Sequence, residues 1–419
     1  MASPSSGQLF NQPASVWAIT FATAVSFVGI GLVSPILPTI AEQLEASAFQ
    51  SMLLFSSYLL VTAATMFFAG FISTRIGIKA TLVTGLVIII IFASLAGLSD
   101  TVGQIIGLRA GWGFGNALFV TMALAGIVGA SNGGSAGAIV LYEAALGMGM
   151  ALGPLVGGSL GTISWQAPFL GTALLMALAA ATITIFVKPL PKPANEPISA
   201  GFTALRQRPL VVWSLASLNF TFTMICVLAY APHALAGAAE ASGIEYSSLT
   251  LGAVFFGWGS ALAICSVLLP RQMIKYLGLV PAILMVLALM AVGMTVMALN
   301  VQNLVVVIVG IIGLGGLQGT TNTLFTEAGL NSTNLPQNIV SSSFSGFRFL
   351  GGAIFPLVSG PLLALWGAPG PFWGSLIALL IASSIIAVGY RVLPAAQRQR
   401  GRMFRRTVEK TTAQTHLPG

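Results

Sequence analysis

The sequence predicts an all-α membrane protein in which twelve transmembrane helices form two six-helix bundles. Two observations lead to this fold class. The 419 residues are 56% hydrophobic and only 6% charged, and their mean hydropathy is +0.95. Apolar runs also follow one another nearly end to end, and a helix needs about 20 mostly apolar residues to cross a bilayer. The expected surroundings of the chain are therefore the lipid bilayer.

Six apolar segments account for the first bundle, which is expected to cover residues 16–187. The loops between them are mostly short, so successive helices are expected to be antiparallel neighbours. Residues 1–15 precede this bundle and contain no Lys or Arg, so they lack the basic start of a cleaved signal peptide. The approximate segment boundaries are 16–40, 51–74, 79–98, 101–127, 136–161 and 165–187.

A long hydrophilic loop, residues 188–209, separates the two bundles. It contains prolines at 189, 191, 193, 197 and 209, and proline at this density resists regular structure. Within the loop, residues 198–207 could form a short surface helix. The second bundle, 210–392, is followed by a basic tail, 393–419. The approximate segment boundaries of the second bundle are 210–235, 248–270, 277–298, 303–326, 338–366 and 371–392.

Basic residues set the expected orientation, because cytoplasmic loops of membrane proteins carry an excess of Lys and Arg. With the N-terminus in the cytoplasm, Arg109 and Arg348 lie inside helices, and the other 15 of the 17 Lys and Arg fall in cytoplasmic loops and the tail. The C-terminus is then cytoplasmic too. The formal charge of +8 is attributed to this topology, so no nucleic-acid partner is expected. The tail is expected to contact anionic lipid, with a regulatory role as the alternative.

Patterns of catalysis and metal binding are missing from the sequence. Cys226 and Cys265 fall in apolar segments, and His233 and His416 lie far apart, so no disulfide, metal site or histidine-based catalytic pair is expected. There is no HExxH, Gly-x-Ser-x-Gly or Walker-type sequence either. An enzyme and an ATP-driven pump are therefore disfavoured, and no cofactor is expected beyond a proton gradient. A receptor or scaffold would be expected to carry a sizeable soluble domain, which the sequence does not show.

The fifth segment carries a strip of small residues. Ala145, Gly149, Gly153, Gly157 and Gly161 recur every four residues, and Pro154 adds a bend. In lipid, helices associate by close backbone approach over such strips. The strip indicates either a surface on which another helix moves or static packing. Its expected partner is a matching strip in the eighth segment: Ala253, Gly257, Ala261 and Cys265.

The two halves of the chain resemble each other at two places. Residues 115–119, Gly-Asn-Ala-Leu-Phe, match residues 321–325, Thr-Asn-Thr-Leu-Phe. Residues 153–158 match residues 355–360 in the same order and at nearly the same offset. Parallel repeats of six helices are one way to build alternating access, with a site near the midplane between the halves.

Three stretches resemble motifs of the major facilitator superfamily, and the resemblance covers nearly the whole chain. Residues 70–79 resemble its signature loop, and residues 109–115 resemble its Arg-x-x-Gln-Gly-x-Gly pattern with Trp112 in place of Gln. Residues 149–158 resemble the antiporter motif of the drug:proton exporters with twelve helices. The resemblance implies the major facilitator fold with both termini in the cytoplasm. It also implies a cytoplasmic gate loop with Gly70, Thr74, Arg75, Gly77 and Lys79, and an antiporter motif comprising Gly149, Gly153, Pro154, Gly157 and Gly158.

The signature loop departs from the family pattern at two positions. Thr74 stands where the family has a carboxylate that helps to latch the cytoplasmic gate, and Ile78 stands at a position that is usually basic. Thr74 could cap a helix by a hydrogen bond but supplies no charge. The latch is therefore expected to be weaker or built differently.

Four ionisable residues lie inside the predicted segments: Arg109, Glu143, Glu327 and Arg348. Such residues are costly in lipid and are functional by default. We expect Glu143 to be the proton-coupling site, with Arg109 on the adjacent antiparallel helix close enough to pair with it. Burial disfavours a charged carboxylate and a nearby arginine favours it, so movement of Arg109 would link protonation to conformation. The alternative is a fixed ion pair that only joins two helices.

The other two charged residues in these segments are Glu327 and Arg348. Glu327 is expected to be a solvated charge at a helix end, and Arg348 is expected to bind an anion or to hold neighbouring carbonyl groups. Aromatic and amide side chains are further candidates for a substrate cavity, with plain packing as the alternative for each. Such a lining suits a moderately lipophilic, weakly polar substrate. The cavity candidates are Phe27, Asn116, Trp213, Asn219, Phe220, Phe222, Tyr230, Gln318, Asn322 and Arg348.

The residues and the family resemblance together predict a secondary transporter of a bacterial plasma membrane. It is expected to act as a monomer and to export a small lipophilic or weakly polar compound or drug in exchange for protons, by rocker-switch alternating access. The alternative is a proton symporter or facilitator for a sugar or an organic anion. Arg109 and Arg348 would suit an anion, whereas the antiporter motif argues against uptake.

Overall fold

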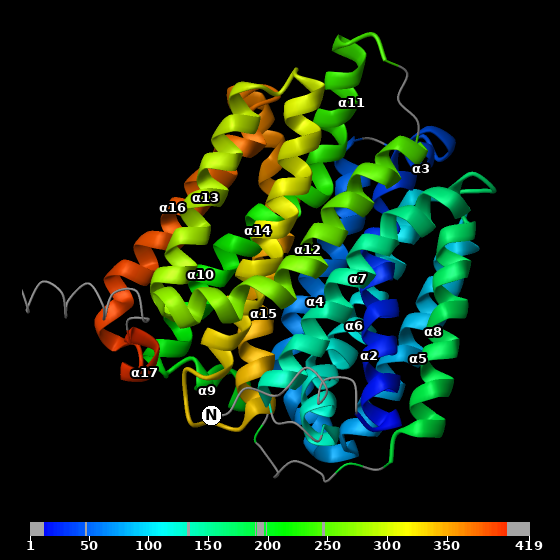
Figure 1. Ribbon diagram of the computed structural model, residues 1–419. Coiled ribbons are helices and arrows are strands. Elements are labelled where there is room, and N and C mark those ends of the chain that lie inside the picture. The colour runs from blue at the N-terminus through cyan, green and yellow to red at the C-terminus, as the bar shows by residue number, and fades with distance from the viewer. Residues whose placement is uncertain are drawn as a thin grey trace, which may run out of the picture.

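The computed structural model of the chain describes residues 12–46, 48–131, 135–188, 190, 197, 199–244 and 248–399. All regular structure in these residues is helical, and twelve helices are long and apolar enough to cross a membrane (Figure 1). The predicted fold class, all-α with twelve spans, is therefore confirmed. Residues 1–11 and the tail from residue 400 onward lie outside the described part of the chain.

The first half of the chain contributes six spans. The first of them is followed by two short helices, η1 (Ser34–Ile36) and α3 (Leu37–Gln43). The connection between the second and third spans is a single residue, Gly77, whose φ of 90° is accessible mainly to glycine. The six spans are α2 (Ala14–Gly31), α4 (Ala48–Ile76), α5 (Ile78–Gly97), α6 (Val102–Ala130), α7 (Ser135–Gly161) and α8 (Ala167–Phe186).

The second half begins after a short helix, α9 (Ala200–Ala204), which lies within the predicted surface helix at 198–207. Its first span consists of α10 (Arg208–Ile225), a π-helical turn (Cys226–Tyr230) and α11 (Ala231–Ala241). The π turn precedes Pro232, which has no amide hydrogen to offer the preceding turn. The remaining helices are α12 (Ser248–Leu277), α13 (Leu279–Leu299), α14 (Leu304–Leu330), α15 (Gln337–Trp366) and α16 (Gly370–Gly389), followed by η3 (Tyr390–Val392) and α17 (Ala395–Arg398).

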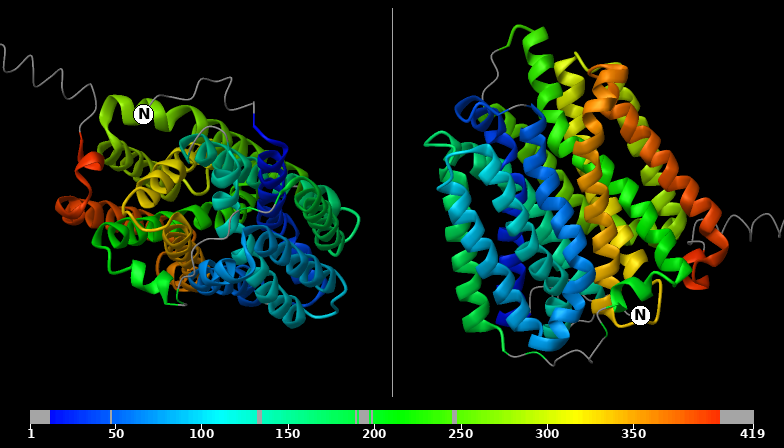
Figure 2. Two further views of the ribbon diagram at one scale, coloured as in Figure 1. Left: turned by 90° about the horizontal axis from the view of Figure 1, so that it is seen from below. Right: turned by 180° about the vertical axis from the view of Figure 1, so that it is seen from behind.

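The two halves lie side by side and meet along two pairs of helices. Helix α4 packs against α15, and α7 packs against α12 (Figures 1 and 2). Within the first half α7 also packs against α2, and within the second half α15 packs against α10. Each half therefore presents its second and fifth spans to the other half, and helices from both halves surround the space between them.

Equivalent glycines make the same contacts in the two halves. A Cβ atom on Gly149 of α7 would lie 2.2 Å from the carbonyl oxygen of Ala24 in α2, and one on Gly351 of α15 would lie 2.0 Å from that of Leu218 in α10. The single-residue connections also repeat, because Gly278 has a φ of 94° where Gly77 has 90°. These contacts follow the repeat that the sequence suggests.

The small-residue strip of α7 packs inside the first half. Cβ atoms on Gly153 and Gly157 would lie 2.8 and 2.2 Å from backbone oxygens of Val28 and Leu32 at the end of α2. The predicted partner strip in α12 is therefore wrong, since Gly257 faces Ile312 of α14 instead. Helix α12 meets α7 on other faces of the two helices, where a Cβ on Gly259 would lie 2.1 Å from the Cα of Ala151. The strip therefore packs within the first half, and the contact between halves uses a different set of small residues.

Candidate functional site

Glu143 of α7 lies in a buried polar contact between the two halves. Its side chain is 1% exposed. One carboxylate oxygen accepts a hydrogen bond of 2.7 Å from the Thr326 hydroxyl, and the other accepts one from the Asn322 amide nitrogen. Both donors belong to α14, so the acid of the first half is held by side chains of the second.

Arg348 of α15 completes this network. One of its nitrogens donates to the Thr326 hydroxyl oxygen at 3.1 Å, and another donates to the amide oxygen of Asn322. An arginine can only donate hydrogen bonds, so it fixes the amide oxygen of Asn322 toward itself and turns the amide nitrogen toward Glu143. A carboxylate that accepts bonds on both oxygens beside a guanidinium has the partners of an ionised group. We refer to Glu143, Asn322, Thr326 and Arg348 as the inter-half network.

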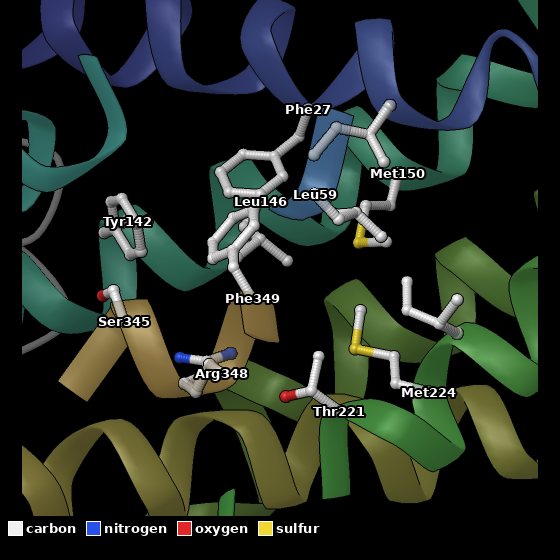
Figure 3. Close-up of a pocket in the computed structure, with 12 residues that line it drawn as sticks. Phe27, Leu59, Tyr142, Leu146, Met150, Thr221, Met224, Ser345, Arg348 and Phe349 are labelled. Carbon is white, nitrogen blue, oxygen red and sulfur yellow. The ribbon is translucent and has the colours of Figure 1, made fainter. Parts of the chain in front are cut away.

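A small cavity adjoins the network between the two halves. It has a volume of about 60 Å³, the space of about two water molecules, so the halves are close together around it. Arg348 reaches its wall, where it lies between Ser345 and Thr221 (Figure 3). The cavity is lined from the first half by Phe27, Ile30, Leu59, Tyr142, Leu146 and Met150, and from the second by Thr221, Met224, Ile225, Ser345, Arg348 and Phe349.

Three of the predicted cavity residues lie at this site. Phe27 and Arg348 line the cavity, and Asn322 stands behind Arg348 in the inter-half network. Phe27 also makes an edge-to-face contact with Tyr142, with ring centres 6.3 Å apart. Both halves therefore contribute residues that the sequence singled out.

The other predicted cavity residues are not among those that line it. The Asn116 side chain accepts a bond from Ser26, Trp213 donates to Gln397, and Gln318 accepts from Trp258, each at 2.9 Å. Asn219 donates to the carbonyl of Leu215 in its own helix, and Tyr230 donates to that of Ala368. Phe220 packs on Phe325, and Phe222 packs on Phe355. Apart from Asn219, which bonds within its own helix, these side chains hold helices together, which is the packing alternative.

Sequence reasoning missed most of the cavity wall. Tyr142, Leu146 and Met150 are spaced by four residues, so they lie on one face of α7, and this face borders the cavity. The signal available was the position of Tyr142 next to Glu143, with an apolar stripe continuing from it. Ser345 and Phe349 similarly flank Arg348 at distances of three and one residues.

The predicted pairing of Glu143 with Arg109 is wrong. Arg109 is fully buried in the first half, where its Nε donates to the carbonyl of Leu54 at 3.3 Å. Its guanidinium carbon lies 4.6 Å from the ring centre of Tyr58 and 4.7 Å from that of Trp112, and its two terminal nitrogens make no hydrogen bond with the described residues. At 1.5 Å per residue, the antiparallel helices α6 and α7 place Arg109 and Glu143 ~20 Å apart in depth.

Side chains of the gate loop contact α8 and the end of α4. Lys79 donates to the carbonyl of Thr184 in α8 at 2.9 Å, and the guanidinium of Arg75 lies 5.2 Å from the ring centre of Phe71. The Thr74 side chain does not cap the start of a helix. Its hydroxyl donates instead to the carbonyl of Phe71, three residues earlier in the same helix, at 2.7 Å. The side chain at the position of the family carboxylate therefore finds its hydrogen-bond partner within its own helix.

Aromatic side chains join the halves at the same end of the molecule. Phe67 of α4 stacks on Phe202 of α9 with ring centres 5.0 Å apart, and it meets Phe347 of α15 at 5.9 Å. The hydroxyl of Ser343 in α15 donates to the carbonyl of Gly201 at 2.6 Å. We call Phe67, Phe202 and Phe347 the aromatic clasp, because their rings connect α9 to a helix of each half.

Comparison with known proteins relates the chain to membrane transporters. The model of the Major Facilitator Superfamily matches residues 19–332. The chain is 42% identical over 386 residues to the "Multidrug efflux protein YfmO" of Bacillus subtilis (strain 168), an alignment that covers 92% of this chain and 95% of that protein. It is 25% identical over 270 residues to the "Tetracycline resistance protein, class G" of Vibrio anguillarum, covering 60% of this chain and 65% of that one.

A solved structure has the same fold. The human organic anion transporter MFSD10 (TETRAN) matches with a TM-score of 0.72 over 89% of this chain and 99% of that chain. The sequence identity is 16%, so this likeness concerns the fold alone. It agrees with the arrangement of twelve spans in two halves.

Proposed function

Because this chain belongs to the major facilitator superfamily, we propose that it exports small lipophilic or weakly polar compounds in exchange for protons. The family consists of transporters, so the chain is a membrane transporter and not an enzyme. Its twelve apolar helices and its bacterial relative make it a multi-pass protein of a bacterial plasma membrane. Export is supported by the printed name of that relative and by the glycine-rich motif of α7, and the apolar cavity wall supports a lipophilic substrate.

Glu143 carries the proposal, because it is a buried acid whose hydrogen-bond donors all come from the other half. The ionised carboxylate suits these donors and the charge of Arg348. A protonated carboxyl has one oxygen that donates, so it would give up part of this bonding and the attraction to Arg348. Protonation of Glu143 would therefore weaken a contact that must break whenever the two halves separate there.

The proposed orientation, with the N-terminus in the cytoplasm, gives this switch a direction. Glu143 lies about two turns from the start of α7, which is then the cytoplasmic side of the cavity. The ionised network would keep this side closed. A proton from outside would neutralise Glu143 and release the contact, and the halves could then rock open toward the cytoplasm. After the proton leaves and substrate enters, the network would re-form and present the substrate to the exterior.

The test is transport by the purified full-length protein in proteoliposomes. We expect wild type to accumulate neutral lipophilic compounds when the lumen, which stands for the cell exterior, is made acidic. A gradient of two pH units supplies about 2.7 kcal/mol per proton, so accumulation can reach about 100-fold for one proton per substrate. Glu143→Gln should lose this response and still exchange substrate across the membrane at equal pH.

Glu327→Gln is the matched control. Glu327 lies in α14 like the partners of Glu143, but it is only half-buried and within electrostatic reach of Arg271 rather than part of the inter-half network. This variant should keep the response to the gradient. Transport by wild type that ignores the gradient, or a full response in Glu143→Gln, would contradict proton exchange through Glu143.

An organic-anion symporter or facilitator is the second candidate, and Arg348 at the cavity wall is the observation that favours it. Symport predicts the opposite sign, because accumulation would then require an acidic exterior of the vesicle, and a facilitator predicts no response to the gradient. A sugar is less suited to this cavity, since a sugar needs many hydrogen-bonding partners and most of the lining side chains are apolar. The direction of the effective gradient therefore separates the two candidates in one experiment.

A further inference from the structure

The charges next to the cavity balance when Glu143 is ionised. Among the residues that line the cavity, Arg348 is the charged one. Its charge is offset by Glu143, which shares both Asn322 and Thr326 with it. Arg109, which is fully buried, is held far from this site between Tyr58 and Trp112. With Glu143 ionised, the site as a whole therefore carries one charge of each sign, linked through Asn322 and Thr326, and no excess charge.

A charged substrate would upset this balance. Isolated charges are expensive in a buried, low-dielectric site unless an opposite charge is close. A cation would meet Arg348 at the wall, and an anion would have to share Arg348 with Glu143. An uncharged molecule adds no unbalanced charge and leaves the network intact.

The cavity wall nevertheless offers hydrogen-bond donors on one side. Figure 3 shows Tyr142 facing Ser345, with Arg348 next to them, whereas Phe27, Leu59 and Met150 lie opposite. The hydroxyl groups of Tyr142 and Ser345 make no hydrogen bond with the described residues, and the hydroxyl of Thr221 already donates to the carbonyl of Ser217 at 2.9 Å. A polar head that accepts hydrogen bonds and an apolar body fit this division.

We propose that the cavity selects uncharged lipophilic molecules with a hydrogen-bond-accepting head group, and that the pairing of Glu143 with Arg348 sets this selection. The inference rests on the proposed function in taking this cavity as the substrate site. Removing the negative charge alone leaves Arg348 unbalanced, so the same cavity then favours a lipophilic anion. Removing the positive charge alone favours a cation, and removing both restores the preference for the neutral molecule.

The probes are three molecules of nearly the same shape: a naphthylbutanoic acid, its primary amide and the corresponding naphthylbutylamine. Equilibrium binding is measured on the purified full-length protein in phosphatidylcholine nanodiscs at neutral pH, with empty nanodiscs subtracted. Wild type should bind the amide at least about tenfold more tightly than the anion or the cation. Glu143→Gln should bind the anion most tightly, Arg348→Gln the cation, and the double variant the amide again. Glu327→Gln is the control and should keep the wild-type order.

Several results would overturn the inference. Equal binding of the amide and the anion by wild type would do so, and so would no binding of the amide or an unchanged order in Glu143→Gln. The order of the three affinities in wild type is itself a test, and it does not depend on whether any variant folds. Binding requires no gradient, so failure of proton-driven transport with the expected order would reject the proposed function alone. Proton-driven transport together with an order of affinities that is the same in wild type and Glu143→Gln would reject this inference alone.

Discussion

Glu143 of α7 and Asn322 of α14 are hydrogen-bonded across the boundary between the two halves. The amide of Asn322 also accepts from Arg348, so a neutral side chain relays between an acid and a base that come from different halves. The bond is possible in this orientation only while Glu143 has an oxygen free to accept. A change of one proton is therefore felt by side chains on both sides of the boundary.

Replacement of Asn322 by Leu should disrupt this relay. Glu143 and Arg348 would each lose a buried partner, and an unsatisfied buried group costs about 1–3 kcal/mol. We expect a lower unfolding temperature of the purified protein and slower proton-driven transport than in wild type. Asn331→Leu is the matched control, because Asn331 is exposed at the end of α14 and bonds only the carbonyl of Glu327 through its side chain. Equal stability of the two variants would contradict a structural role for the relay.

The close packing of α7 on α2 leads to a second prediction. Gly149→Ala would place a methyl group 2.2 Å from the backbone oxygen of Ala24, and backbone cannot move aside as a side-chain tip can. Overpacking of this kind costs about 1–3 kcal/mol, so the unfolding temperature should fall. Gly360→Ala is the control in the second half, since no heavy atom lies within 4 Å of its Cβ position. A fall of the same size in both variants would mean that alanine itself, and not the contact, is responsible.

Much of the fold follows from composition and from the length of the apolar runs. Which face of each helix packs against which neighbour does not follow from them. The apolar runs locate the twelve spans, because a bilayer requires each of them to be long and uncharged. The rotation of each helix about its axis depends on which neighbour its small residues meet. The strip at Gly149 and Gly153 could meet any smooth helix, and in the structure it meets α2 rather than α12.

The same limit applies to the site. Glu143 and Arg348 stand out in the sequence because charges are rare in apolar segments. Their connection through Asn322 joins α7, α14 and α15, which are far apart in the sequence, so no local pattern contains it. The sequence places Arg109 and Glu143 on adjacent helices, but the full lengths of α6 and α7 put the two residues at different depths. The amide oxygens of Asn116 and Gln318 accept hydrogen bonds from Ser26 and Trp258, and neither side chain lines the cavity.

Arg109 should contribute to the stability of the protein through the planar shape of its guanidinium as well as through its charge. The guanidinium lies near the rings of Tyr58 and Trp112, an arrangement worth about 0.5–2 kcal/mol for each ring. Arg109→Lys keeps the charge but loses the planar group that stacks on rings, so the unfolding temperature should fall. Tyr58→Leu should lower it as well, and the double variant should lose less than the sum of the two. Additive losses would show that Arg109 and Tyr58 do not act together.

The aromatic clasp should keep the predicted cytoplasmic end closed where Thr74 supplies no charge. Phe202→Ala removes the ring that stacks on Phe67, and an aromatic pair of this kind is worth about 0.5–1.5 kcal/mol, or about 2- to 10-fold in an equilibrium. The readout is labelling of Ser343→Cys by a membrane-impermeant maleimide, in a chain with Cys226 and Cys265 replaced by Ser. Labelling should be faster by that factor in Phe202→Ala. Phe186→Ala is the control, because Phe186 is an exposed aromatic at the end of α8 outside the clasp. Unchanged labelling in Phe202→Ala would mean that the clasp does not close this end, and equal acceleration in Phe186→Ala would mean that any lost ring loosens it.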